Sequence, residues 1–288
     1  MPEPLVDVAH FTDPGCPFAF SAEPHRIKVL WNFGDQVRLR TRLIVLSDSP
    51  QELADRGFTT ELMSTYYVQL QREHGMPITD QPFPRLHHTR PACELVAGVR
   101  RHAPDRADRV LREMRKVTMA GNLMDEPETL ARAATASGLD AAAALAWAKE
   151  PETLAELEVD WRETRDPGPV SMGALRHKLS EWSGGMRYSA PSWIATAGGT
   201  RTELPGFISY DAYESALGNL APQLEKRGAP TDATEALRWA EAQDIGALAT
   251  VEVATLLGVG VEAAREALKA SDAQLEVAGL DGYWSLAS

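Results

Sequence analysis

The sequence predicts an α/β fold in which two sheet-forming segments flank a long helical insertion and a small C-terminal module follows. Three observations support this prediction. A strand–helix–strand pattern occupies residues 5–46, a nearly continuous helical pattern covers residues 50–166, and a hairpin with a further helix lies within residues 190–224. Helices that separate two strand-bearing halves are typical of a helical domain inserted into an α/β domain.

Composition and charge narrow the class of protein. The 288 residues are 44% hydrophobic and 24% charged, as in ordinary globular chains. A formal net charge of −12 argues against general affinity for nucleic acid or anionic membranes. Two cysteines do not make a disulfide scaffold, no secretory signal is visible, and no apolar run approaches the ~18 residues that cross a bilayer. We therefore expect a cytoplasmic protein with reduced thiols and no membrane contact.

The first strand leads into a loop rich in proline and glycine that carries Cys16. Pro17 suits the first position of a helix, because its missing N–H would be unpaired there. Cys16 would then lie at a helix N-terminus, where free N–H groups and the helix dipole stabilise negative charge. We expect a lowered pKa for this thiol, which would react as the thiolate well below pH 8. The alternative is a small buried hydrophobic residue, and the Cys-Pro pair alone does not decide between the two.

The loop is followed by a helix and a second strand. The pattern predicts a helix over Phe18–Phe33 that ends at Gly34, with Pro24 as a kink inside it. Residues 37–46 alternate and then become continuously apolar, which indicates a strand that enters a buried sheet. Strand, crossover helix and strand make a parallel, right-handed βαβ unit.

The insertion, residues 50–167, shows helical periodicity without strand-like alternation. Proline, glycine or asparagine separates five or so helical segments. These segments begin near Pro50, Arg90, Asp105, Pro127 and Asp140.

The α/β pattern returns at about Val170. Residues Met172–Trp182 are predicted to be helical, with a glycine pair ending the helix. Trp193–Thr196 and Thr200–Leu204 are predicted to form a hairpin around a glycine turn. A further helix, within residues 210–224, would close the sheet, and Pro191 alone is typical of a strand entry.

The tail, residues 232–288, follows a short polar linker and resembles a winged helix. Its pattern predicts three helices and a terminal β-hairpin, at Ala233–Glu241, Thr250–Leu257, Val261–Ala270 and Leu275–Leu286.

The charge of this tail argues against binding to DNA, which depends on cations that contact phosphates. From Ala233 onward the sequence has nine acidic residues and only three basic ones, Arg238, Arg265 and Lys269. The segment in the position of a recognition helix carries Glu262 and Glu266. We expect no nucleic-acid partner and favour a module for packing or for formation of a homodimer.

The segment Asp13-Pro14-Gly15-Cys16-Pro17-Phe18 resembles the active-site loop of DsbA-like thioredoxin-fold proteins, especially the FrnE-type group. That group is similar to kappa-class glutathione transferases and 2-hydroxychromene-2-carboxylate isomerases. The resemblance covers residues 5–224 approximately, and it implies a thioredoxin-like domain made of residues 1–49 and 168–224. The redox members of the family carry Cys-Pro-x-Cys, whereas Ala19 occupies the second cysteine position here, so a dithiol–disulfide cycle within the loop is not available.

The resemblance also implies a set of site residues. Cys16 and Pro17 would be catalytic together with Pro191, which resembles the family's cis-proline opposite the thiol. Cys93 falls where a FrnE-type motif has histidine, and it is either a resolving thiol or a small buried residue. The substrate would contact Asp13, Phe18, His88, Thr89 and Ala190. His87 and His88 have no third ligand at a recognisable spacing, so we expect no metal.

Three functions remain open at this point. The first is a DsbA-like thiol oxidoreductase that uses the single Cys16 thiol, with glutathione or mycothiol as a co-substrate and no covalently bound cofactor. The second is an isomerase or transferase that activates a bound thiol cofactor, with lid contacts from Tyr66, Tyr67, His87 and Arg90. The third is a redox-inactive binding protein. No Walker loop, dinucleotide fingerprint or zinc motif is present in the sequence.

Overall fold

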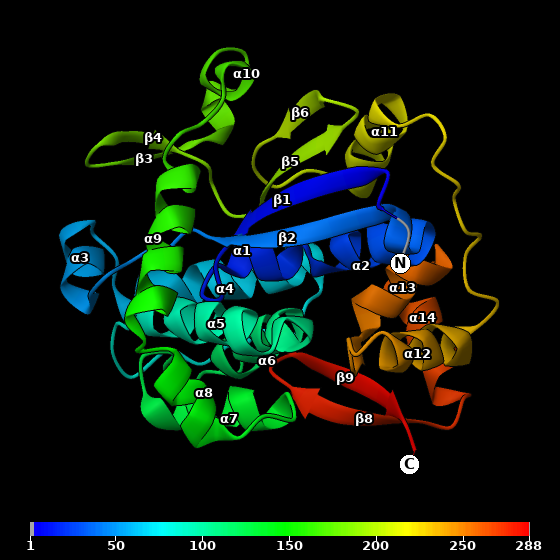
Figure 1. Cartoon of the computed structure of the whole chain (residues 1–288). Coiled ribbons are helices and arrows are strands. Elements are labelled where there is room, and N and C mark those ends of the chain that lie inside the picture. Colours follow the sequence, from blue (N-terminus) through cyan, green and yellow to red (C-terminus); the bar gives the residue numbers. More distant parts are fainter. Residues whose placement is uncertain (1–2, 288) are drawn as a thin grey trace.

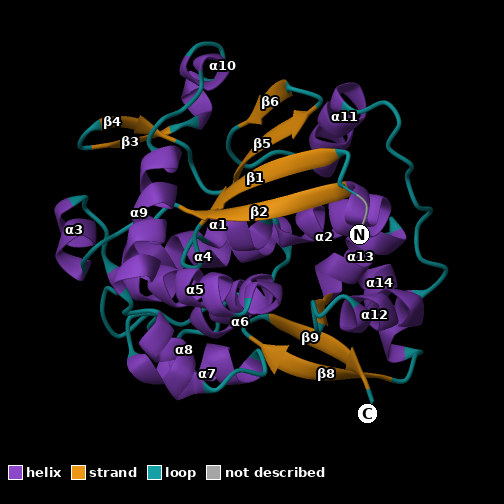
Figure 2. Cartoon of the chain, viewed as in Figure 1, coloured by secondary structure: helices purple, strands orange, loops and turns teal. Residues whose placement is uncertain are grey.

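The computed structural model describes residues 3–287, and it arranges a twisted sheet, a helical region and a C-terminal group of helices and strands around one another (Figure 1). The predicted domain boundaries also include Met1, Pro2 and Ser288, which lie outside the described residues. Helices dominate the chain, and the two longest strands lie in the central sheet (Figure 2). None of the helices in residues 3–287 is long and apolar enough to cross a membrane.

The central sheet combines two segments that are far apart in the sequence. Its strand order is β2-β1-β5-β6. The strands are β1 (Val6–Thr12), β2 (Val37–Leu43), β5 (Ser192–Ala197) and β6 (Thr200–Leu204). β1 and β2 are parallel, with Val6 opposite Val37, while β5 runs antiparallel to β1 and to β6. The predicted βαβ unit and the predicted hairpin are therefore confirmed, and the hairpin joins the sheet beside β1.

The predicted helix over Phe18–Phe33 is two helices, α1 (Pro17–Ser21) and α2 (Glu23–Phe33), which meet at Ala22. Pro24 occupies one of the first two positions of α2. Proline has no N–H to donate inside a helix, so it stands at the start of a new helix instead of kinking one.

The second strand ends at Leu43, three residues before the end of the strand predicted over residues 37–46. Val45 has a φ of +54°, which β-branched residues rarely adopt and which interrupts an extended strand. Residues 44–46 consequently turn toward the Cys16 loop, and the Ile44 N–H donates to the Thr12 carbonyl at 2.9 Å.

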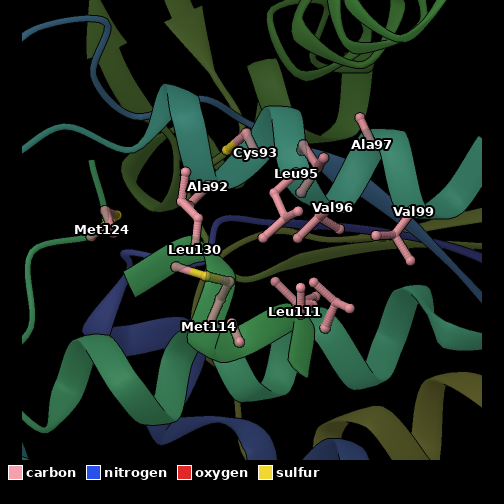
Figure 3. Close-up of a cluster of buried hydrophobic side chains, with 14 of the residues drawn as sticks. Ala92, Cys93, Leu95, Val96, Ala97, Val99, Leu111, Met114, Met124 and Leu130 are labelled. Carbon is pink, nitrogen blue, oxygen red and sulfur yellow. The ribbon is translucent and has the colours of Figure 1, made fainter. Parts of the chain in front are cut away.

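The insertion is helical, as predicted. It contains α3 (Pro50–Asp55), α4 (Thr60–His74), α5 (Arg90–His102), a 3-10 turn (Pro104–Arg106), α6 (Ala107–Met119), α7 (Pro127–Ala136), α8 (Ala141–Trp147) and α9 (Pro151–Thr164). Apolar side chains of α5, α6 and α7 interlock in a buried cluster with the end of β2 (Figure 3). This cluster packs α5 and α6 against the carboxyl end of β2, which is also the end of the sheet at which the Cys16 loop lies.

The prediction of a helix over Met172–Trp182 is wrong. The chain instead forms α10 (Pro169–Met172), a 3-10 turn (Arg176–Lys178) and a hairpin of β3 (Ser180–Trp182) and β4 (Gly185–Arg187). Trp182 pairs with Gly185, whose φ of +131° only glycine adopts easily. The glycine pair therefore turns a hairpin and does not end a helix.

The C-terminal region begins after α11 (Tyr210–Leu220) and packs on α2. It contains α12 (Ala233–Ala242), β7 (Leu248–Ala249), α13 (Thr250–Leu257), α14 (Val261–Lys269), β8 (Ala273–Ala278) and β9 (Asp281–Leu286). The predicted three helices and hairpin are present, and the short β7 completes a sheet of order β7-β9-β8. Ile27 and Trp31 of α2 share a buried cluster with Leu237 and Val253 of this region. The assignment as a winged helix stays a prediction.

Candidate active site around Cys16

Cys16 lies at the carboxyl end of β1, at the N-cap of α1. Its side chain belongs to a buried cluster with Phe11, Ile44, Tyr188 and Ile194, and the residue is 6% exposed. Three segments distant in sequence therefore surround one thiol: the β1 loop, the segment after β2, and the segment before β5.

The thiol points at the segment that contains Pro191. Cys16 Sγ donates to the Ala190 carbonyl oxygen at 3.4 Å, and the Ala190–Pro191 peptide bond is cis. The expected placement of Pro191 opposite Cys16 is thus present. Pro17 occupies the start of α1, as expected, and Phe18, which follows it, is 48% exposed. Phe18 is therefore an exposed part of the loop, whereas Cys16 beside it is covered.

Asp13 holds the loop from inside. It is fully buried, with Oδ1 accepting from the Gly15 N–H at 2.8 Å and Oδ2 accepting from the Leu46 N–H at 2.9 Å. Burial raises the pKa of this carboxyl, although both N–H groups favour its charged form. These contacts fix the loop against the segment after β2.

Cys93 is also close to the loop, but it faces Asp13. It is a free thiol, fully buried in the cluster of Figure 3, and its Sγ donates to Asp13 Oδ2 at 3.6 Å. Burial and the nearby Asp13 charge raise the pKa of Cys93 well above its usual value. A thiol in this state is a poor nucleophile.

Thr89 and His88 lie on the insertion side of the loop. The Thr89 N–H donates to Ser47 Oγ at 3.2 Å, and the Thr89 methyl group packs so closely that a Cβ on Gly15 would lie 2.8 Å from it. His88 faces Asp125, with Nε2 3.8 Å from the nearer carboxylate oxygen. In residues 3–287 no three His, Cys, Asp or Glu side chains are grouped to hold a metal ion.

The expectation of a lowered pKa for Cys16 is wrong for this conformation. Burial raises the pKa of the thiol to about 11, because an ionised sulfur would lose its hydration among apolar side chains. The backbone N–H groups of Ala19 and Phe18 favour the thiolate, as a helix start should, but burial outweighs them. The donated hydrogen bond to Ala190 fits a protonated thiol.

This raised pKa predicts the pH profile of Cys16 alkylation. Because only the thiolate reacts, the rate of alkylation by iodoacetamide should rise by about tenfold per pH unit toward pH 11, without a plateau near neutrality. The measurement is labelling of a Cys93→Ser variant at pH 6–10, followed by mass spectrometry. A plateau below pH 8 would contradict the buried, protonated state.

A buried arginine from the insertion lies beneath the loop. The Arg115 guanidinium donates to Thr12 Oγ1, just before the loop, and to Glu23, just after α1. It is 1% exposed. Arg115 therefore holds both ends of the segment that carries Cys16, and its charge favours the thiolate.

Arg115 belongs to an ionic network that reaches the C-terminal region. Glu23 also pairs with Arg26 at 3.0 Å and lies 3.7 Å from Arg112, which binds both carboxylate oxygens of Glu252 at 2.7 Å. All five side chains are buried. A cavity of about 330 Å³ lies beside Arg26 and Arg112, and its lining does not include Cys16.

Two arginines of this region, Arg115 and Arg187, were not predictable from the sequence, and Arg187 ends β4 near the thiol. Arg115 stands within an amphipathic helical pattern, and Arg187 lies between the predicted helix and the predicted hairpin, so neither position carries a motif. Only the folded arrangement brings them to Cys16.

The comparisons agree with this geometry at the level of the fold. No family model matches the sequence, and a comparison with curated proteins found no match. A search of solved structures did find similar folds. A candidate protein disulfide isomerase from Nitrosomonas europaea aligns with a TM-score of 0.59 at 13% identity, covering 76% of this chain and 98% of its own. A candidate DsbA oxidoreductase from Streptomyces coelicolor aligns with a TM-score of 0.55 at 17% identity. The alignment covers 79% of the chain described here and 94% of the Streptomyces protein.

A third similar structure is the cytosolic disulfide reductase DsbM from Pseudomonas aeruginosa, with a TM-score of 0.53 at 15% identity, covering 74% of this chain and 97% of its own. DsbM has also been solved with glutathione, and that structure aligns with a TM-score of 0.51. The chain described here therefore has a DsbA-like thioredoxin fold.

Proposed function

We propose that this protein is a thiol-disulfide oxidoreductase that uses Cys16 as its single nucleophile. The observation that carries the proposal is the contact of Cys16 Sγ with the Ala190 carbonyl, directly before Pro191. The Ala190 carbonyl is the group to which an extended substrate would bind, so thiol and substrate would meet there. The DsbA-like fold supports the same assignment.

The chemistry would be an exchange of disulfides. The Cys16 thiolate attacks one sulfur of a substrate disulfide, a Cys16–substrate disulfide forms, and the second substrate sulfur leaves as a thiolate that takes up a proton. A second thiol, as thiolate, then attacks the substrate sulfur of this mixed disulfide and returns Cys16 to its reduced state.

The second thiol would come from a small molecule. Ala19 stands where a second loop cysteine would be, and Cys93 is fully buried with its sulfur directed at Asp13. Glutathione is one such thiol, and its binding to the similar DsbM supports this choice; mycothiol is another. A location in the reducing cytoplasm suits such a reaction, and DsbM is itself cytosolic.

Turnover of hydroxyethyl disulfide with glutathione as the reductant tests the proposal. We expect turnover that depends on enzyme concentration and increases with pH, because the Cys16 pKa of about 11 limits the amount of thiolate.

The burial of Cys16 favours one other function, a redox-inactive binding protein. Absence of turnover between pH 7 and 10 would support that function instead.

A further inference from the structure

Three arginines lie next to the Cys16 cluster, at one edge of the molecule. Arg56 follows α3, Arg165 follows α9 and Arg187 ends β4, and these elements occupy the left side of Figure 1. The net charge of the chain is −12, so a gathering of cations is unusual for its composition. Like charges at one edge repel one another unless an anion lies among them.

Two of these arginines have no carboxylate partner. Arg165 donates to the Ile44 carbonyl at 2.9 Å and Arg187 to the Tyr188 carbonyl at 2.9 Å. Neither guanidinium lies within 4.0 Å of a carboxylate oxygen anywhere in residues 3–287. Arg187 is nevertheless buried, with only 5% of its surface exposed. Buried cations are normally paired at close range. Glu52 pairs with Arg56 at 3.8 Å and acts on Arg165 and Arg187 only from beyond 4.0 Å, so a closer negatively charged group would complete the arrangement.

Buried hydrogen-bond donors without partners also indicate a site for a negatively charged group. The Nε atom of Arg165 and the indole Nε1 atom of Trp182 are buried, and neither has a hydrogen-bond partner within the described chain. The Arg165 guanidinium lies 4.0 Å from the Trp161 ring centre and 5.0 Å from that of Trp182. A guanidinium edge beside an indole N–H presents donors that suit a carboxylate.

The arginines are connected to the thiol through the chain. Ile44 and Tyr188, which accept from Arg165 and Arg187, belong to the same buried cluster as Cys16. Arg187 precedes Ala190 by three residues, which span at most about 10 Å of extended chain. A small molecule could therefore place an anionic group at Arg187 while its sulfur reaches Cys16.

The electrostatics agree with this geometry. Burial, together with the charge of Arg187, lowers the pKa of Arg165 to about 10. Burial and the charge of Arg56 also lower the pKa of Arg187, and a negative charge on Cys16 opposes that change. A bound carboxylate would relieve both effects.

We propose that Arg165, Arg187 and Trp182 form a binding subsite for carboxylate groups of a small-molecule thiol or disulfide that reacts with Cys16. Arg56, on the exposed rim, would add attraction for the same anion. This inference rests on the proposed function, and it assigns the substrate to the class of small acidic thiols. The reaction is the disulfide exchange described above, with the carboxylates unchanged.

The test compares two disulfide probes of similar size. The anionic probe is 3,3′-dithiodipropionate, the neutral probe is hydroxyethyl disulfide, and the readout is the rate of mixed-disulfide formation at Cys16 by mass spectrometry at low ionic strength. Arg187→Met and Arg165→Met should each lower the anionic-to-neutral rate ratio by roughly tenfold and leave the neutral rate within about twofold. Trp182→Phe, which removes the indole donor and keeps an aromatic ring at this position, should lower the ratio by roughly threefold. Arg132→Met is the matched control, because Arg132 lies on α7 and contacts Asn122.

The outcomes separate this inference from the proposed function. Reaction of the neutral probe with an unchanged ratio in all three variants would overturn the subsite and leave Cys16 chemistry standing. If neither probe reacts, the proposed function fails, and the subsite is tested by calorimetric binding of S-methylglutathione. Binding at least about tenfold weaker in Arg187→Met than in the wild type would support the subsite, and equal affinity or no binding by either would overturn it.

Discussion

Replacing Cys16 with serine is expected to lower the turnover of hydroxyethyl disulfide by roughly a hundredfold or more, to the uncatalysed rate. A hydroxyl in this position cannot form a disulfide, and within residues 3–287 no other sulfur donates a hydrogen bond to the Ala190 carbonyl. The measurement is turnover at pH 9 with glutathione in excess, where more of the Cys16 thiol is ionised than at neutral pH.

Cys93→Ser is the matched control for this experiment. It removes the other thiol of the chain, and serine can still donate to Asp13. If the second thiol comes from solution, Cys93→Ser should keep turnover within about threefold of the wild type. A loss as large as that of Cys16→Ser would mean that Cys93 takes part in the cycle.

Glu23→Gln is expected to destabilise the fold by about 3–5 kcal/mol, the cost of breaking a buried ionic network from one side. Glu23 is 1% exposed and neutralises Arg26, Arg112 and Arg115. Glutamine keeps the shape of the side chain and removes its charge, which leaves three buried cations with less compensation. Urea denaturation followed by circular dichroism measures the change in the free energy of unfolding.

The network also predicts how stability depends on pH. Burial opposes ionisation of Glu23, but Arg26 and Arg115 outweigh it and lower its pKa to about 2 from 4.5. The native state therefore holds fewer protons at this carboxyl than the unfolded state. The contribution of Glu23 to the free energy of unfolding is thus complete above pH 4.5 and disappears as pH falls toward 2.

Glu163→Gln is the control for the Glu23→Gln variant, because Glu163 pairs with Arg42 at the surface, where an ion pair contributes about 0–1 kcal/mol. Equal losses in the two variants would contradict the role given to Glu23.

The network gives the C-terminal region a structural role. Arg112 of α6 joins Glu23 of α2 to Glu252 of α13, so the helical insertion, the sheet domain and the C-terminal region share one set of buried charges. The predicted packing function of this region is consistent with these contacts. Formation of a homodimer stays a prediction.

The fold was largely predictable from the sequence because its signals are local. The alternation at β1 and β2, the glycine turn between β5 and β6, and the helical periodicity of the insertion each reflect burial of one face of an element. Two of the errors occurred where glycine or proline had two possible structural uses. Pro24 starts a helix instead of kinking one, and Gly185 turns a hairpin instead of ending a helix.

The placement of Cys16 beside the segment of Pro191 was predictable, but the electrostatics around the thiol were not. The loop residues identified Cys16, and the resemblance placed Pro191 opposite it. The pKa of Cys16 depends instead on Ile44, Tyr188 and other apolar side chains from distant segments, which no local pattern reveals. Arg165 and Arg187 likewise reach the carbonyl groups of Ile44 and Tyr188, which belong to the Cys16 cluster, only after the chain has folded.

The most direct test of the central claim, that Cys16 is the reactive thiol, is the order in which the two cysteines react in the native protein. Reduced protein is treated with a substoichiometric amount of 2,2′-dithiodipyridine at pH 8.5, and the modified peptides are identified by mass spectrometry. We predict modification of Cys16 first, with Cys93 modified only after unfolding in urea, because Cys93 is fully buried against Asp13. Modification of Cys93 before Cys16, or equal protection of both thiols, would contradict the account.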